Sequence, residues 1–328
     1  MEYIVPNFGK SRAIPLEFPY RSRAKQWSEK ASVRTAALRP LQSETHASDI
    51  RFFPIEYAPL AQHPLVKNLG TEALRFIEVQ HAYHYIGEIA YTEMELINKV
   101  AQDIFSGNFP FLLPSAFRMD MLSIIIDEAY HTYAAIDFSS QVQAITHIPP
   151  LELENDNRLQ QAIAHCSPHF RHDPTSQAIF SLFAIGLYEN IITDDLVTMK
   201  KATSALCQYF DDHMQDEGRH ASLFQVAMKQ VWQALSKQQR HTLGQALADF
   251  LLILLDPALL HAFHQGLLNA LGLSEQAEQI LTEVYPQSHK HLAAKQNRHF
   301  IHLIGVLKRT NVFNHLPTKQ YFEQAQLL

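Results

Sequence analysis

The chain has 328 residues, of which 47% are hydrophobic and 18% charged, so it is long enough to bury a large core and too apolar to be disordered. The formal net charge of −6 argues against a nucleic-acid-binding protein, which would need a basic patch. Cys166 and Cys207 provide no disulfide framework, and neither a signal-peptide pattern nor an apolar run long enough to cross a bilayer is present. These features predict a cytoplasmic protein that contacts neither nucleic acid nor membrane.

Helices are predicted along almost the whole chain, because glycine is scarce and apolar residues recur at helical spacing. Residues 1–70 are the exception: they carry seven prolines and predict an irregular arm that wraps the body, with short helices at most. The long predicted helices cover residues 71–105, 115–140, 174–200 and 202–235. Shorter helices are predicted over residues 158–166, 237–271 with a break near 256–257, 274–284 and 288–309. The expected fold is an all-α, ferritin-like four-helix bundle over residues 71–328, a single domain with additional C-terminal helices.

One short pattern, D-E-x-x-H, occurs twice, at residues 127–131 and 216–220. Residues three apart share a helix face, so Glu128 with His131, and Glu217 with His220, are spaced to bind one metal ion together. One such pattern is a common accident. Two copies on long helices, each with apolar residues along its flank, predict two buried pairs of metal ligands.

A bundle of this kind needs one further inward-facing glutamate from each of two other helices. Glu93 has only apolar residues at the positions one and two turns away, whereas Glu95 has polar ones at the same offsets, so Glu93 is predicted to face inward. Glu189 is surrounded by apolar residues in the same way. Four buried carboxylates need compensation, no basic residue lies on these stripes, and two Fe(II) ions would neutralise them.

His213 extends the stripe of Glu217 and His220 by one turn and is predicted to be a third histidine ligand. Asp127 and Asp216 are predicted to accept hydrogen bonds from the ligand imidazoles and so to fix their tautomers. The full set of predicted metal ligands is Glu93, Glu128, His131, Glu189, His213, Glu217 and His220.

In order and spacing, over residues 75–235, this set resembles the para-aminobenzoate N-oxygenase family of non-haem diiron enzymes. The additional histidine distinguishes that family from ferritins and other ferritin-like diiron proteins. The resemblance implies two Fe ions, O2 as a co-substrate, and oxidation of an amine nitrogen to hydroxylamine, nitroso or nitro products. It also implies a small-molecule amine substrate, a homodimer, and an external electron donor such as a ferredoxin or a reductase.

The resemblance also suggests a substrate pocket. The family has a tyrosine two turns before the first ligand glutamate, and Tyr85 stands there. Where the family has an asparagine beyond the third glutamate, this chain has Asp195, and Arg298 is the candidate partner of a substrate carboxylate. Because these positions depart from the family pattern, the sequence does not predict which amine is the substrate.

Other functions fit part of the pattern. A diiron hydroxylase or desaturase acting on carbon, with a carrier-tethered substrate, would share every ligand apart from His213. A non-enzymatic iron-storage protein would share the bundle but needs neither the arm nor the extra helices. A structural helical protein would pair its buried glutamates and histidines with each other. Manganese is an alternative to iron at such ligands.

Overall fold

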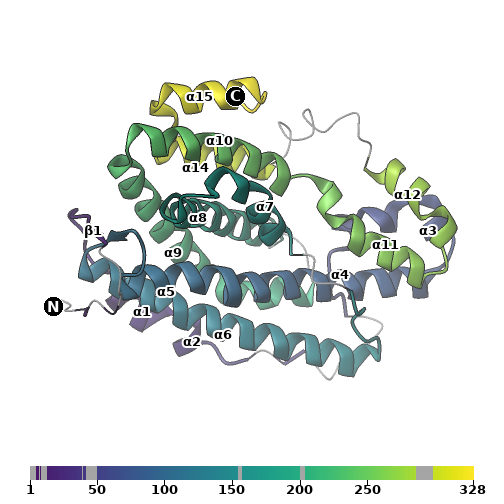
Figure 1. Cartoon of the computed structure of the whole chain (residues 1–328). Helices are drawn as coiled ribbons and strands as arrows, with labels where there is room; N and C mark the ends of the chain where they lie inside the picture. The colour runs from purple at the N-terminus through teal and green to yellow at the C-terminus, as the bar shows by residue number, and fades with distance from the viewer. Residues whose placement is uncertain are drawn as a thin grey trace.

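The computed structural model describes residues 5–6, 8, 13–38, 40–41, 50–153, 157–199, 204–285 and 298–328. Four long helical segments form its centre: α4 (Thr71–Tyr91) continued by η4 and α5, α6 (Ser115–Thr146), α8 (Pro174–Met199) and α9 (Ala205–Ala234). In Figure 1, α5 and α6 lie along the lower side, with α8 and α9 above and behind them. The predicted all-α, ferritin-like fold is confirmed.

Helices α8 and α9 pack closely along their lengths and run antiparallel. The Thr193 hydroxyl lies 3.4 Å from the Glu217 carbonyl near one end, and the rings of Phe183 and Trp232 lie 6.0 Å apart towards the other. Gly186 permits the close approach between them, since a Cβ atom there would lie only 3.0 Å from the end of the Met228 side chain.

The helix predicted over residues 71–105 is one continuous rod with an unpredicted change of geometry. Between α4 and α5 (Asn98–Ser106), residues Thr92–Ile97 form a π-helical segment, η4, which contains Glu93. Such segments often occur at functional sites. The rod ends at Gly107, whose positive φ of 81° closes the helix without steric cost.

Helix α6 continues six residues beyond its predicted end at 140, to Thr146. The segment predicted as a connection carries on the helix because no breaker occurs before Pro149, and Val142 extends its buried face. His147, in the left-handed conformation, then ends the helix.

The arm has short elements, as expected, but its paired strand was not predicted. It contains β1 (Ile14–Pro15), α1 (Ala24–Lys30), α2 (Ser32–Thr35), η2 (Ile55–Tyr57), η3 (Pro59–Gln62) and α3 (Pro64–Lys67). Strand β1 pairs in parallel with β2 (Phe111–Leu112). Helices α1 and α2 pack against α6, and α2 also packs against α9, so this part of the arm lies over the ligand helices.

The remaining helices cover the bundle at its upper side and at one end (Figure 1). They are α7 (Arg158–Cys166), η5 (Ser167–Phe170), α10 (Lys237–Leu254), η6 (Pro257–Leu260), α11 (His261–Ala270), η7 (Ser274–Gln276), α12 (Ala277–Val284), α14 (Arg298–Arg309), η9 (Val312–Asn314) and α15 (Leu316–Gln324). The helix predicted over 288–309 is described only from Arg298, because residues 286–297 lie outside the described part.

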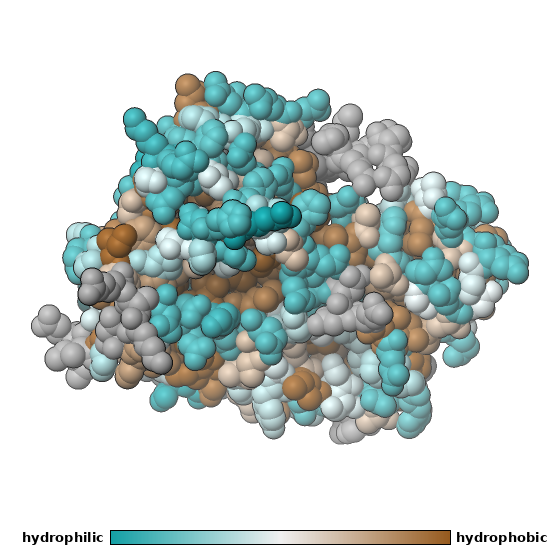
Figure 2. Space-filling view, viewed as in Figure 1, coloured by the Kyte–Doolittle hydropathy of each residue, from teal (hydrophilic) through white to brown (hydrophobic). Residues whose placement is uncertain are grey.

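Helix α15 was not predicted, because its sequence lacks a wide apolar stripe. It packs on α10, where Thr318 lies so close to Gly244 that a Cβ atom there would collide with the Thr318 hydroxyl. The surface shown in Figure 2 is mainly hydrophilic, with hydrophobic side chains visible in the recess between the upper and lower helices.

Within the described residues, no single helix is long and apolar enough to cross a membrane. Residues Lys237–Leu254 and Pro257–Ala270 meet the criteria of length and composition only when taken together, and they bend by 51° at the break. Apolar residues of the first helix, among them Leu247 and Phe250, are buried in the core.

Candidate metal centre

Six of the seven predicted ligands come together in the middle of the bundle, in two overlapping groups of four. The first group is Glu93, Glu128, His131 and Glu217, and the second is Glu128, Glu189, Glu217 and His220. Within each group, one nitrogen or oxygen atom per residue lies within 4.8 Å of the others. The two groups share Glu128 and Glu217, so each holds one histidine and one glutamate of its own together with two shared carboxylates.

All these side chains are buried, and their oxygen atoms are poorly satisfied. Glu128 and Glu189 are 0% exposed, while Glu93 is 3% exposed, and Glu95 two residues away is exposed as its polar neighbours predict. Neither carboxylate oxygen of Glu189 has a hydrogen-bond partner among the described residues. A buried carboxylate without partners is costly, so this arrangement suits a cation bound between the groups.

Each central histidine is held between glutamates and an aspartate. Nε2 of His131 lies 3.3 Å from Asp216, and Nε2 of His220 lies 3.1 Å from Asp127. Each aspartate therefore contacts the imidazole of the other helix. A proton on Nε2 donated to these carboxylates leaves the Nδ1 atoms available for a metal.

The Nδ1 atoms face the glutamates. Nδ1 of His131 lies 3.0 Å from both Glu128 and Glu217, and Nδ1 of His220 lies 2.9 Å from Glu128. These distances suit hydrogen bonds between the imidazoles and the carboxylates. Pairing of this kind does not account for Glu189, which has no such contact among the described residues.

The pKa shifts in the cluster reflect crowding of negative charge. Burial, and next the nearby Glu128 carboxylate, raise the pKa of Glu93 and of Glu189 well above the ordinary value. Burial also acts to raise the pKa of Glu128, but the charge of His220 and the hydrogen bond with His131 outweigh it and lower the pKa to about 2. The four carboxylates thus do not share one environment, and the two outer ones favour their neutral form until a cation is present.

Arg219 corrects the expectation that no basic residue is buried here. Its side chain is 7% exposed, and its guanidinium contacts the carboxylates of both Asp127 and Asp216. The arginine therefore compensates the aspartates, not the glutamates. The sequence could have indicated a buried arginine, since Arg219 lies inside the second D-E-x-x-H segment.

His213 lies beside the cluster but belongs to neither group of four. Its ring centroid is 4.4 Å from that of His131, and its Nδ1 atom is buried without a hydrogen-bond partner among the described residues. Burial, and next the charge of His131, lower the pKa of His213 to about 3, so the imidazole is neutral.

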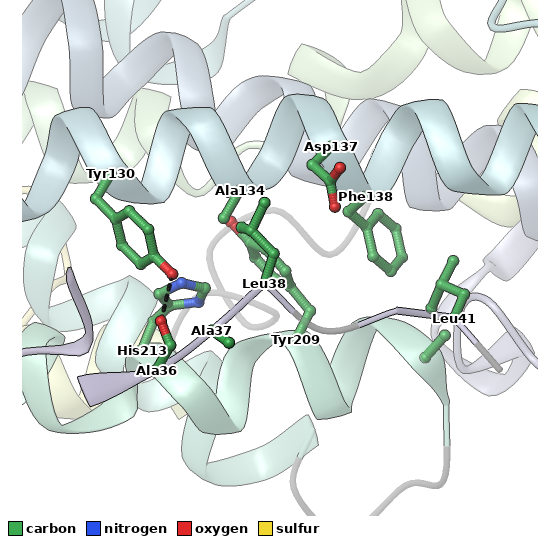
Figure 3. A pocket seen from close by; sticks show the side chains of 11 residues that line it. Ala36, Ala37, Leu38, Leu41, Tyr130, Ala134, Asp137, Phe138, Tyr209 and His213 are labelled. Atoms are coloured by element: carbon green, nitrogen blue, oxygen red, sulfur yellow. Dashed lines mark hydrogen bonds between the residues drawn. The ribbon is translucent and has the colours of Figure 1, made fainter. Parts of the chain in front are cut away.

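His213 also lines a small, mainly apolar cavity (Figure 3). It has a volume of about 20 Å³, and its walls come from α6, α9 and the arm. Tyr130 closes one end with a 2.7 Å hydrogen bond to the Ala36 carbonyl, drawn in Figure 3. The cavity has room for about one water-sized molecule and is too small for an organic substrate.

Comparison with known proteins identifies the family of the chain. Residues 24–305, a span that includes every residue of the two groups, match the family described as p-aminobenzoate N-oxygenase AurF. The chain belongs to this family.

Among curated proteins, the chain is similar to a 4-aminobenzoate N-oxygenase of Streptomyces thioluteus, with 24% identity over 234 residues. The match covers 69% of this chain and 65% of that protein, slightly less than two thirds of the relative's length. Membership in the AurF family agrees with the helical bundle and with a buried Glu and His cluster that is able to bind metal ions.

The three residues suggested for a substrate pocket line one larger cavity, of about 580 Å³. The Tyr85 hydroxyl donates a 2.9 Å hydrogen bond to Asp195, and Arg298 lies 3.2 Å from the same carboxylate. Arg298 also contacts Asp194 at 2.9 Å, so its charge is already paired. The cavity walls include residues that were not predicted, namely His81, His84, Glu88, Arg158 and His264.

The arm also contributes contacts that were not predicted. The Trp27 indole donates a 2.8 Å hydrogen bond to Asp127, and the Ser32 backbone N–H donates a 2.9 Å hydrogen bond to Asp216. No local pattern in residues 24–35 indicates these contacts, because they form only when the arm docks across α6 and α9.

Proposed function

We propose that this member of the AurF family is a non-haem diiron oxygenase that uses O2 to oxidise the nitrogen of a small-molecule amine to a hydroxylamine, nitroso or nitro product. The observation that carries the proposal is the pair of overlapping four-residue groups with Glu128 and Glu217 in common. A single metal ion needs only one such group, whereas two groups with shared carboxylates suit two ions.

The ligand assignment follows from the groups. Glu93 and His131 would bind one ion, Glu189 and His220 the other, and the two shared glutamates would bridge them. We further propose His213 as a seventh ligand, because it is neutral, buried and adjacent to His131. Carboxylate and imidazole ligands suit iron and also admit manganese.

Two bound Fe(II) ions would supply redox chemistry that the side chains lack, namely the activation of O2. Conversion of an amine to a hydroxylamine consumes one O2, two electrons and two protons, and it releases one water. The electrons would come from an external donor, such as a ferredoxin or a reductase.

The chain's own residues would orient the ligands and exclude water. Asp127 and Asp216 hold His220 and His131 with Nδ1 towards the glutamates, and the Arg219 guanidinium contacts both aspartates. Apolar residues such as Ile89 and Ile97 surround Glu93 and keep bulk water out. Tyr85 and Asp195 would border the substrate.

The metal assignment is tested with a matched pair of variants. Glu93→Ala should lose bound iron, measured by elemental analysis after anaerobic loading and desalting, whereas Glu95→Ala should retain the wild-type content because Glu95 is exposed. Equal iron content in both variants would contradict the assignment.

The reaction is tested by mass spectrometry of the products from a panel of aryl and alkyl amines, with iron-loaded protein and peroxide as the source of oxidant. Hydroxylamine, nitroso or nitro products that depend on Glu93 support the proposal. Products hydroxylated or desaturated on carbon would instead identify a carbon oxygenase, and iron uptake without multiple turnover would indicate storage.

We also propose that the protein acts as a cytoplasmic homodimer. On α6, Tyr133 is 59% and Ile136 is 61% exposed, which provides apolar surface for a second copy. Light scattering should give twice the mass of one chain for the wild type and a reduced mass for Tyr133→Glu.

A further inference from the structure

The cavity of about 580 Å³ that begins at Tyr85 is bordered by α4, α11, α14 and the start of α7. Its apolar walls include Phe53, Leu254 and Phe263, and its volume lies within the range typical of sites for small organic ligands. Tyr85 and Glu93 are eight residues apart on one helical rod, about 12 Å along the axis. The rings of Tyr85 and Phe210 are in contact, and Phe210 lies one turn before His213, so the cavity approaches the cluster at Tyr85.

The polar groups of this cavity are unusual because several are neutral imidazoles. The Nδ1 atom of His81 donates a 2.9 Å hydrogen bond to the Ile77 carbonyl, which leaves Nε2 as an acceptor with no partner among the described residues. Burial lowers the pKa of His81 to about 4, so this acceptor is retained at neutral pH. His84, one turn further along, has a buried Nε2 atom that lies 3.9 Å from the Glu88 carboxylate and has no hydrogen-bond partner in the described part of the chain.

His264 adds a third imidazole from α11. Its ring centroid is 5.5 Å from that of His81, and its Nδ1 atom lies 3.1 Å from the Tyr285 hydroxyl. Burial, and next the neighbouring histidines, lower its pKa well below the ordinary value. A buried acceptor that finds no donor in the protein favours a ligand that brings one.

The charged groups of the cavity are already paired. Arg158 donates a 2.8 Å hydrogen bond to Glu88, and Arg298 lies between Asp194 and Asp195. His299 contacts both of these aspartates at 3.1 Å. With Asp256, which also lines the cavity, four carboxylates among the described residues accompany these two guanidinium groups and the His299 imidazole, so the cavity has no excess of positive charge with which to bind an anion.

We propose that this cavity binds the end of the substrate distal to the amine, and that it selects a neutral hydrogen-bond donor there, such as an amide or a hydroxyl group, over a carboxylate. The inference rests on the proposed function, because it assigns the cavity to the substrate of the cluster. The substrate class is therefore an extended neutral amine, in contrast to the aminobenzoate named for the relative.

Binding is measured separately from turnover, by calorimetric titration of iron-loaded, oxidised protein without reductant. The ligands are three amines that differ in one group: 4-aminobenzamide, methyl 4-aminobenzoate and 4-aminobenzoate. The same three groups on 4′-aminobiphenyl provide longer probes. The amide donates hydrogen bonds, the ester only accepts them, and the acid is an anion.

We expect the amide to bind roughly 2- to 12-fold more tightly than the ester, as one added neutral hydrogen bond allows. The carboxylate should bind at least about tenfold more weakly than the amide, because it brings a charge to paired groups. His81→Phe should remove the advantage of the amide over the ester, and His264→Phe should reduce it.

His165→Phe is the control, since His165 is exposed on α7 away from the cavity, and it should bind all ligands as the wild type does. Thermal melting and iron content identify any variant that fails to fold. If one of the two cavity variants does not fold, the other still tests the proposal. Tighter binding of the carboxylates, or an amide preference unchanged in both cavity variants, would overturn the inference. Preference for the amide without oxidation of any amine would retain the binding site and refute the N-oxygenase function.

Discussion

Arg219 lies between the buried carboxylates of Asp127 and Asp216. This contact explains how the proposed site tolerates two buried aspartates in addition to its four glutamates. Asp127 and Asp216 each contact a central histidine on one side and share the same guanidinium on the other. Without the arginine, two more buried negative charges would lie beside four glutamates. The residue is therefore part of the charge balance, although it contacts none of the proposed ligand oxygens.

Arg219→Met should lower the free energy of unfolding by about 3–5 kcal/mol, because it leaves two buried carboxylates without their cation. Denaturant titration of the purified variant measures this loss. Arg171→Met, at an exposed position, should change stability by no more than about 0.5 kcal/mol. A loss below about 1 kcal/mol for Arg219→Met would show that the aspartates find other partners.

His81 makes stability depend on pH. Its pKa is lowered from 6.5 to about 4 by burial, so between these values the unfolded chain binds a proton that the folded chain does not. Stability should therefore fall as the pH drops through this window, by at most about 3 kcal/mol from this residue. His84 and His264, which line the same cavity, shift in the same direction, although Glu88 partly opposes the shift of His84.

This contribution is isolated by denaturant titrations of wild type and His81→Phe at intervals between pH 7 and pH 4. The variant lacks the titrating group, so its stability relative to wild type should rise as the pH falls. Curves that stay parallel across the window would contradict the lowered pKa.

At the scale of elements, the arm is a functional part of the proposed site. Helices α1 and α2 place the Trp27 indole and the Ser32 backbone N–H on the two aspartates that orient the histidines. These donors reach the site only because the arm docks across α6 and α9. The arm thus supports the ligands from outside the bundle.

Trp27→Phe keeps most of the apolar contact and removes the donor to Asp127. We expect metal affinity to fall by less than the roughly 10- to 100-fold that is typical when a direct partner of a ligand histidine is lost, because Trp27 contacts Asp127 and not the imidazole of His220. Competition with a coloured chelator measures the affinity. Glu29→Ala, on the exposed side of the same helix, should retain wild-type affinity, and an equal effect in both variants would point to a general disturbance of the arm.

At the scale of the whole molecule, the bundle gathers more negative charge in its centre than its own cations balance. Glu189 is the clearest case, since both of its carboxylate oxygens are buried and have no hydrogen-bond partner within the described part of the chain. A structure that keeps such a group is expected to gain stability from a bound cation and to be less stable without one.

Anaerobic addition of Fe(II) should raise the melting temperature, with a gain in folding free energy of about 3 kcal/mol at a hundredfold excess over the dissociation constant. Glu189→Gln should be at least as stable as the metal-free wild type, because a neutral amide replaces a buried carboxyl group that is costly to ionise, and it should gain less stability from Fe(II). A melting temperature that does not respond to the metal in the wild type would contradict the proposed centre.

The spacing of residue types along the chain predicted the bundle helices and most of the cluster. Helical periodicity predicted the four bundle helices to within a few residues for most ends, and the contrast between the neighbours of Glu93 and Glu95 predicted which carboxylate is buried. Two D-E-x-x-H segments marked the helices that meet at the cluster. These inferences succeed because the faces of a helix are set by its own sequence.

Tertiary structure alone decided which groups meet across elements. It paired each histidine with the aspartate of the opposite helix, placed Arg219 between both aspartates, and brought Trp27 of the arm to the site. It also assembled the histidine-lined cavity from helices far apart in the sequence. Such contacts depend on how helices are packed and in what register, and no periodicity within a single helix encodes that.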